Sequence, residues 1–304
     1  MKKEIKDKTA SVKAKLLNIS TKTNVDFDAL LLLYFQERFL YRLAISQFSG
    51  NFILKGGLLL FCLNVIWSRP TKDIDFLAKG VKNTASALQS IFKNIAGLSC
   101  DDGVNFDLSS ISSERIIENT EYVGIRLKIK TYLGKAWKVL QFDVGFGDTL
   151  WPKPELIEFP GLLEESRPLL RAYSVESIIA EKFEIMLKKE MMNSRMKDFF
   201  DIYNLSFSYN FSGKILKKAI ENTLGKRQTV LNEIPIVFRE EFQKDGGKKQ
   251  QWTAFLRKTR LNKPDQDFGG IMERIIDFLK PLVVSINENK EMEQSWDPKK
   301  GIWK

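Results

Sequence analysis

Two aspartates separated by one residue are the side chains best suited to chemistry in this sequence. Asp73 and Asp75 lie in a segment, residues 73–78, whose pattern is typical of a half-buried strand. Successive side chains of a strand point to opposite faces, so both carboxylates lie on the same face. Two carboxylates on one face form a ligand set for a divalent cation. A solvated strand end is the alternative interpretation of this pair taken alone.

Residues before and after the pair favour the cation site. Gly56 and Gly57 follow a short predicted strand and precede a short apolar helix, so they allow a tight turn that brings backbone N–H groups close to phosphate oxygens. Asp143, on a later predicted strand, would add a third carboxylate. Three carboxylates suit two magnesium ions, which clamp nucleotide phosphates and activate an attacking hydroxyl. We therefore predict a metal site made by Asp73, Asp75 and Asp143.

Lys182 is a second candidate. On a helical wheel it falls on the apolar side of its helix, beside Ile179 and Met186. A lysine there needs a partner, and we expect its amine to face bound nucleotide and balance triphosphate charge. The alternative is a lysine whose amine reaches solvent at the edge of the core.

Two further acids, Asp198 and Asp201, share one face of the next predicted helix. Either could hold Lys182 or a ribose hydroxyl. The alternative is that they only stabilise the N-terminus of that helix.

The composition excludes several kinds of chemistry. The 304 residues contain no histidine and only two cysteines, Cys62 and Cys100. Catalytic triads with a histidine base and histidine-ligated or cysteine-based zinc sites are therefore excluded, and carboxylates and lysines must supply the acid–base and metal chemistry. The apolar stretches are too short for a membrane span, and residues 1–20 lack the apolar block of a signal peptide, so we expect a cytoplasmic protein.

The elements that must position these residues follow from periodicity. We predict a long amphipathic helix over 27–48, strands at 52–54 and 73–78, and a hairpin whose strands, 125–129 and 138–144, flank a turn at Gly134. A proline-rich stretch after residue 151 marks a boundary, beyond which the chain is predicted to be almost entirely helical. We therefore predict two domains, residues 1–160 and residues 161–304.

The net charge of +10 lies mainly outside the nearly neutral middle of the chain. Basic residues gather in two clusters of the C-terminal half, around Lys217 and Arg227 and around Lys248, Lys249, Arg257 and Lys258. These clusters would suit a polyanion such as RNA. The alternative is a solvated helix surface.

Taken together and in order, these motifs resemble the AbiEii/AbiGii nucleotidyltransferase toxins. The resemblance spans roughly residues 10–260 and rests on the segments 37–43 (Glu-Arg-Phe-Leu-Tyr-Arg-Leu), 52–57 (Phe-Ile-Leu-Lys-Gly-Gly), 69–76 (Arg-Pro-Thr-Lys-Asp-Ile-Asp-Phe), 180–182 (Ala-Glu-Lys) and 195–203 (Arg-Met-Lys-Asp-Phe-Phe-Asp-Ile-Tyr). It implies an α+β fold with a DNA polymerase β-like nucleotidyltransferase core and a helical C-terminal domain. It also implies a toxin of a type IV toxin–antitoxin or phage-exclusion system, with a cognate antitoxin as a partner.

The resemblance assigns roles residue by residue. It implies metal ligation by Asp73 and Asp75, a catalytic lysine at Lys182 and a last acidic motif at Asp198, whereas Asp143 matches a third acid only by its place on a late strand. Nucleotide contacts are expected from Lys55, Gly56, Gly57, Arg69, Thr71 and Lys182. Leu58 departs from the pattern, because many nucleotidyltransferases have serine or threonine after the glycines.

The predicted reaction is transfer of a nucleotide from an NTP, with Mg²⁺ or Mn²⁺, to an RNA acceptor. Some members of the family add nucleotides to the 3′ end of tRNA, so a tRNA 3′ end is the expected acceptor. Two alternatives stay open at this point: transfer to a protein side chain, and a non-catalytic module of the same fold that binds RNA or protein.

Overall fold

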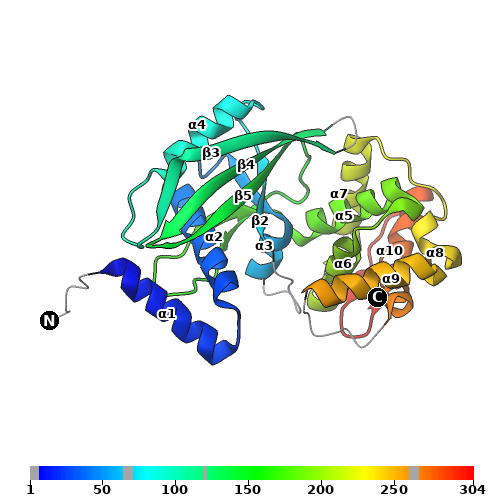
Figure 1. Ribbon diagram of the computed structural model, residues 1–304. Coiled ribbons are helices and arrows are strands. Elements are labelled where there is room, and N and C mark those ends of the chain that lie inside the picture. The colour runs from blue at the N-terminus through cyan, green and yellow to red at the C-terminus, as the bar shows by residue number, and fades with distance from the viewer. Residues whose placement is uncertain (1–6, 64–70, 119–121, 260–266) are drawn as a thin grey trace. The chain divides into compact units, whose positions relative to one another are not determined.

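The computed structural model describes residues 7–63, 71–118, 122–259 and 267–304 (Figure 1). The chain divides into two compact units. Of the described residues, the first unit comprises those within 7–62, 71–147 and 155–172, and the second comprises residue 63 and those within 148–154 and 173–304. Relative to the predicted boundary after residue 160, the main body of the second unit starts at Tyr173, and the earlier segment 148–154 also belongs to it.

A seven-stranded mixed sheet forms the centre of the first unit. Its order is β3-β4-β5-β2-β1-β7-β6, in which β2/β5 and β1/β7 are parallel and the other pairs are antiparallel. The strands are β1 (Phe52–Lys55), β2 (Asp73–Ala78), β3 (Asn105–Glu118), β4 (Tyr122–Leu133), β5 (Ala136–Phe146), β6 (Glu155–Glu158) and β7 (Leu169–Ala172).

Four helices accompany this sheet: α1 (Lys8–Thr23), α2 (Phe27–Ile45), α3 (Gly56–Cys62) and α4 (Ala85–Ala96). Helix α2 begins where Asp26 accepts a hydrogen bond from the Ala29 N–H, and α4 begins in the same way at Thr84. The apolar faces of both helices pack on one side of the sheet, where Phe39 and Phe92 contact Phe142 of β5. The opposite side of β4 and β5 is the more exposed one, as their alternating burial shows, and it carries charged side chains together with Trp137 and Val139.

The second unit is built mainly of helices, several of which Figure 1 labels. They are α5 (Val175–Lys189), α6 (Met196–Ser208), α7 (Gly213–Arg227), α8 (Glu240–Lys244), α9 (Gly246–Thr259) and α10 (Phe268–Asn287), with 3₁₀ turns at Glu190–Met192 and Ile236–Phe238. Aromatic side chains fill the core between α6, α8, α9 and α10, with Phe199 and Phe200 at its centre.

A three-stranded antiparallel sheet completes the second unit. It consists of β8 (Phe211–Ser212), β9 (Ser295–Asp297) and β10 (Ile302–Trp303) in the order β10-β9-β8. Trp296 is 1% exposed, and its ring centre lies 4.8 Å from that of Phe278 on α10. The small sheet therefore packs against that helix.

The structure confirms the predicted α+β class and the main predicted elements: the helix after residue 27, the strands around 52 and 73, the hairpin, and the helices beyond residue 174. Helices α1 and α8 and strands β3, β6, β7, β8, β9 and β10 were not predicted, so the chain beyond the proline-rich stretch is less uniformly helical than its sequence predicts. None of the helices in the described part of the chain combines the length and the apolar composition that crossing a membrane requires.

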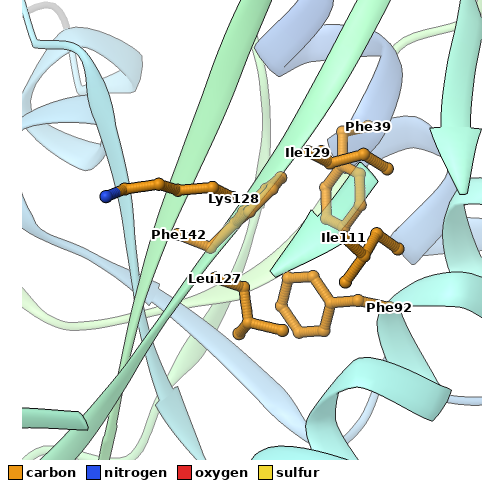
Figure 2. A pocket seen from close by; sticks show the side chains of 7 residues that line it. All are labelled: Phe39, Phe92, Ile111, Leu127, Lys128, Ile129 and Phe142. Atoms are coloured by element: carbon orange, nitrogen blue, oxygen red, sulfur yellow. The ribbon is translucent and has the colours of Figure 1, made fainter. Parts of the chain in front are cut away.

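Figure 2 shows a hollow in the core of the first unit, at the irregularity in β3 between Asp107 and Ser112. Apolar side chains line it, among them Phe39, Phe92 and Phe142, and it has no room for a water-sized sphere. The amine of Lys128 points away from these rings, towards the other side of the sheet. The hollow is therefore a packing feature of the core and not a ligand site.

Candidate active site

Strand β2 brings the two aspartates into a row of charged residues that crosses the sheet. Asp75 is the register partner of Lys55 on β1 and of Asp143 on β5, and Asp143 is the partner of Arg126 on β4. Register partners in neighbouring strands point to the same face. Asp73 lies two residues before Asp75 and therefore shares that face. The structure thus brings together Lys55, Asp73, Asp75 and Asp143, as the sequence predicts.

Gly56 can lie next to this row of charged residues because it has no side chain. Its φ is +71°, a region that favours glycine, and a Cβ built on it would lie 1.9 Å from Oδ2 of Asp75. The first glycine of the motif therefore lets the chain leave β1 directly beneath the Asp75 carboxylate. Gly57 follows as a buried residue of α3.

Arg126 is the closest described partner of Asp143. Its Nε and Nη2 donate to the two carboxylate oxygens at 2.8 and 2.7 Å, a bidentate arrangement. The hydrogen bond to Asp143 raises the pKa of the guanidinium above its usual value, and the charge of Asp73 acts in the same direction. Arg126 thus adds a second positive charge, besides Lys55, to a face that carries three carboxylates.

The fit of a divalent cation can be judged from these side chains. Asp73 and Asp75 are half-buried and lie on one face, which suits a hard cation with oxygen ligands. Both oxygens of Asp143 are already bonded to Arg126. In the part of the chain that the structure describes, no three acidic or cysteine side chains come together as a metal-binding group. The fit therefore rests on Asp73 and Asp75, and Asp143 as a third ligand stays a prediction.

The segment before β2 is held by a residue of α2. Gln36 is 1% exposed, and its amide donates to the Lys72 carbonyl at 3.1 Å and to the Thr71 carbonyl at 3.5 Å. The Thr71 hydroxyl donates to the Asp73 carbonyl at 3.3 Å. A buried amide and a hydroxyl thus fix the backbone that leads into Asp73. Arg69, predicted to contact nucleotide, lies outside the described residues.

The second unit carries the other predicted residues in a buried cluster. Nζ of Lys182 on α5 lies 2.7 Å from a carboxylate oxygen of Asp198 and 2.7 Å from one of Asp201, both on α6. Arg195 donates from Nε to the other oxygen of Asp198 at 2.6 Å. The Lys182 amine therefore lies between two carboxylates and not at a solvated edge of the core.

The electrostatics of this cluster favour its charged form. Burial by itself would raise the pKa of Asp198, but Lys182 and Arg195 hold that pKa well below its usual range. The Asp198 side chain has no solvent exposure, and that of Asp201 is 2% exposed. Asp201 therefore has a partner role that the sequence left open: it is a second carboxylate on Lys182.

Helix α5 is anchored on its other side by Arg227. The Arg227 guanidinium lies 2.8 Å from Glu184 and 3.0 Å from Asp148, and Tyr173 donates from its hydroxyl to Glu181 at 2.9 Å. Arg227 was predicted to belong to a polyanion-binding cluster, but it is engaged in this network instead. Its pKa is raised, because the neighbouring acids outweigh the opposite effect of burial.

Comparison with known proteins decides what these sites belong to. The model of one family, described as "Nucleotidyl transferase AbiEii toxin, Type IV TA system", matches residues 38–274. That range covers most of both units and includes Lys55, Asp73, Asp75, Asp143, Lys182 and Asp198. The chain belongs to the AbiEii nucleotidyltransferase toxin family.

Two solved structures resemble this AbiEii protein. A crystal structure of a candidate nucleotidyltransferase from H. pylori is 15% identical, with a TM-score of 0.50 over 87% of this chain and 98% of the other. A crystal structure of JHP933 from Helicobacter pylori is 16% identical, with a TM-score of 0.49 over 87% of this chain and 99% of the other. No curated protein matches the chain significantly. At these identities the first likeness shows the shared fold, and the nucleotidyltransferase activity follows from the family.

Two residues beside the candidate site, Arg126 and Gln36, are absent from the set that the sequence predicts. Arg126 could have been found, because the turn between Leu133 and Ala136 fixes the hairpin register and places Arg126 opposite Asp143. Gln36 left no such signal, since its partners lie more than 30 residues away.

The basic surface of this AbiEii protein is smaller than its sequence predicts. Lys248 is 4% exposed and donates to the carbonyls of Met191 and Asn193, and Lys217 donates to the Lys290 carbonyl. These two lysines hold the fold together and are unavailable to a polyanion. Lys249 and Arg257 remain exposed on one face of α9, beside a hollow of about 390 Å³.

Proposed function

We propose that this AbiEii protein transfers a nucleoside monophosphate from an NTP to the 3′ hydroxyl of an RNA, with tRNA as the acceptor. The acceptor oxygen would form a bond to the α-phosphorus, the bond from that phosphorus to the β-phosphate oxygen would break, and pyrophosphate would leave. The proposal rests chiefly on one observation: Asp73 and Asp75 share a sheet face with Lys55 and Arg126, directly above the Gly56 turn.

In this proposal Asp73 and Asp75 hold Mg²⁺ or Mn²⁺. The ion, when bound, would polarise the phosphates and favour loss of the acceptor proton. Lys55, with backbone and hydroxyl groups of Gly56, Gly57 and Thr71, would bind the nucleotide.

Asp143 has a further role in this proposal. It would serve as a third ligand, or help to deprotonate the acceptor, through the oxygen lone pairs that the two hydrogen bonds from Arg126 leave.

Residues of the second unit also have roles in this proposal. We assign Lys182, together with Arg69, to neutralisation of the phosphates, and Asp198 to holding the Lys182 amine at 2.7 Å. Catalysis in such a site is largely positioning and electrostatic stabilisation.

An RNA acceptor is favoured by the basic residues that remain exposed, among them Lys249, Arg257 and Lys258 on α9. Phosphate contacts of this kind make affinity fall steeply with salt. We place the reaction in the cytoplasm, where NTPs and tRNA meet, and expect the cognate antitoxin to restrain it there.

The test is an incubation of the full chain with α-³²P-labelled NTPs, Mg²⁺ and total tRNA, followed by nuclease or by protease. Label that nuclease removes and protease leaves supports the proposal, and sequencing of RNA 3′ ends identifies the added base. Label that survives nuclease and disappears with protease would overturn the RNA acceptor in favour of a protein one. Asp75→Asn and an EDTA-treated sample are the controls, and label unchanged by both would overturn the metal assignment.

A separate measurement tests the alternative of a non-catalytic module with the same fold. Calorimetry of the wild type with a non-hydrolysable NTP should show binding that requires Mg²⁺ and that Asp75→Asn weakens. Heat that is absent with every NTP, with and without Mg²⁺, would contradict the proposal.

A further inference from the structure

The open face of the hairpin β4–β5 carries an aromatic and basic strip that the proposed chemistry does not use. On β5 this face presents Trp137, Val139 and Gln141 at every second position, and on β4 it presents Lys128 and Lys130. Trp137 is 54% exposed and Val139 is 42% exposed. Large apolar side chains exposed together on a sheet face mark a binding surface more often than an isolated exposed residue does.

The lysines complete the chemistry of the strip. Nζ of Lys130 lies 6.0 Å from the centre of the Trp137 ring, a cation–π arrangement. Lys128 pairs with Glu114 of β3 at 3.0 Å, but both side chains are largely exposed, at 41% and 55%. An ion pair this exposed contributes only about 0–1 kcal/mol, so an incoming phosphate can replace the glutamate at little cost. None of the β4 and β5 residues of the strip is acidic.

The strip leads directly to the candidate site. Val139 is paired with Lys130, and Gln141 is paired with Lys128. The next pair on the same face is Asp143 with Arg126, and Asp143 is in turn paired with Asp75 on β2. Asp143 lies six positions after Trp137 on β5, which at about 3.3 Å per residue is about 20 Å. That length accommodates a few nucleotides of an extended single strand.

We infer that the strip of Trp137, Val139, Lys130, Lys128 and Gln141 binds the unpaired 3′ end of the RNA acceptor and directs its terminal hydroxyl towards Asp73 and Asp75. An exposed aromatic ring on a sheet face stacks a base, and lysines beside it take the phosphates, which is the general way in which proteins hold single-stranded nucleic acid. The inference rests on the proposed function, because it names the surface that serves an RNA acceptor.

The test measures tRNA binding without NTP, so that no turnover occurs. Two probes are compared: a tRNA with its unpaired 3′ nucleotides and the same tRNA trimmed back to its last base pair. Trp137→Ala should weaken binding of the intact tRNA by at least about tenfold, the lower part of the range for loss of one stacked base. Trp137→Phe should retain most of the affinity. Trimmed tRNA should bind wild type and Trp137→Ala alike.

The lysines have a matched test. Lys128→Ala/Lys130→Ala should reduce the salt dependence of intact tRNA binding by roughly 0.7 log units per log unit of salt for each single-strand phosphate lost. Lys138→Ala is the control, because Lys138 projects to the other face of the same strand and pairs with Asp28. Leu156→Ala controls for loss of an exposed apolar side chain, since Leu156 is 63% exposed on β6.

Equal affinity of wild type and Trp137→Ala for intact tRNA would overturn the inference, and so would an equal loss on intact and trimmed tRNA. Failure of the proposed function looks different: wild type would then label no RNA at all in the transfer assay. If wild type labels RNA and Trp137→Ala has an unchanged KM for RNA, the strip does not bind the acceptor. The proposed function would not be affected by that result.

Discussion

The two groups of predicted residues differ in how their charges are accommodated. In the first unit, Asp73 and Asp75 are half-buried on a polar sheet face, and the neighbouring pair of Asp143 and Arg126 keeps side-chain exposures of 21% and 31%. In the second unit, Lys182 is enclosed with Asp198 and Asp201, whose side chains are 0% and 2% exposed.

Because the two groups differ in exposure, substitutions in them have different consequences. A carboxylate on an open face can be neutralised without leaving a buried charge, so its loss reports on function. A member of the enclosed cluster cannot, because removing one partner leaves the others buried and uncompensated. The same substitution therefore separates function from stability in one unit and confounds them in the other.

The largest expected effect is on transfer by the first group. Asp73→Asn or Asp75→Asn should lower turnover by at least about a thousandfold, since loss of a metal ligand removes several kcal/mol of transition-state stabilisation. The free energy of unfolding should change by less than about 0.5 kcal/mol, as at an ordinary surface position. Turnover by labelled-NTP incorporation and urea unfolding of the same samples measure both. Near-wild-type turnover by a folded variant would remove the metal assignment.

The next effect sharpens the contrast, because it falls on both properties at once. Lys182→Met should lower the free energy of unfolding by about 3–5 kcal/mol, since it leaves buried carboxylates without their cation. Its turnover should fall more than about tenfold, a change of about 1.4 kcal/mol in the barrier.

A compensated variant separates the two roles of Lys182. Lys182→Met/Asp201→Asn removes one charge of each sign and leaves Asp198 with Arg195. We expect it to recover part of the stability but none of the activity. Recovery of both would make Lys182 purely structural.

The turn beneath Asp75 offers a matched pair of glycines. Gly56→Ala should destabilise the first unit by about 1–3 kcal/mol, the usual cost of a non-glycine residue in strained backbone, and should displace the Asp75 carboxylate. Gly145→Ala is the control, because a Cβ there meets its nearest neighbour, Nζ of Lys55, at an ordinary 3.7 Å. The unfolding temperature and the turnover of the two variants should differ clearly. Equal values for both variants would contradict the close approach of Gly56 to Asp75.

A smaller effect is expected at the buried amide that holds the segment before β2. Gln36→Met should lower turnover about tenfold and the free energy of unfolding by about 1–2 kcal/mol, because two carbonyl groups lose their donor. Gln89→Met removes a comparable side-chain hydrogen bond, to Ser113. If Gln89→Met lowers turnover equally, Gln36 acts through stability alone and does not position Asp73.

The smallest effect is on stability as a function of pH. The pKa of Asp198 is lower in the folded chain than the ordinary value of about 3.9, so the folded state binds fewer protons than the unfolded state. Its contribution is therefore present above about pH 4 and is lost as the pH falls towards the lowered folded value. Urea unfolding between pH 7 and pH 3 should show this loss in wild type and a shallower one in Asp198→Asn. Parallel pH profiles would contradict the charged cluster.

Features that depend on neighbouring residues could be predicted without the fold. The alternation around Asp73 and Asp75 places both carboxylates on one face, because side chains alternate along any strand. The position of Lys182 on an apolar helix face implied a buried cation that needs a partner, because an unpaired buried charge is costly. The largely helical character of the chain beyond the proline-rich stretch followed from the periodic spacing of its apolar residues.

Contacts between residues far apart in the chain are visible only in the folded molecule. The approach of Gly56 to Asp75, the hold of Gln36 on the segment before β2 and the burial of Lys248 each join segments far apart in the chain. Such contacts depend on strand order and on which helix faces are covered, and these are set by burial of the whole core. Local periodicity fixes the direction of a side chain relative to its own backbone but not what lies opposite it, so the partners of these residues emerge only from the folded chain.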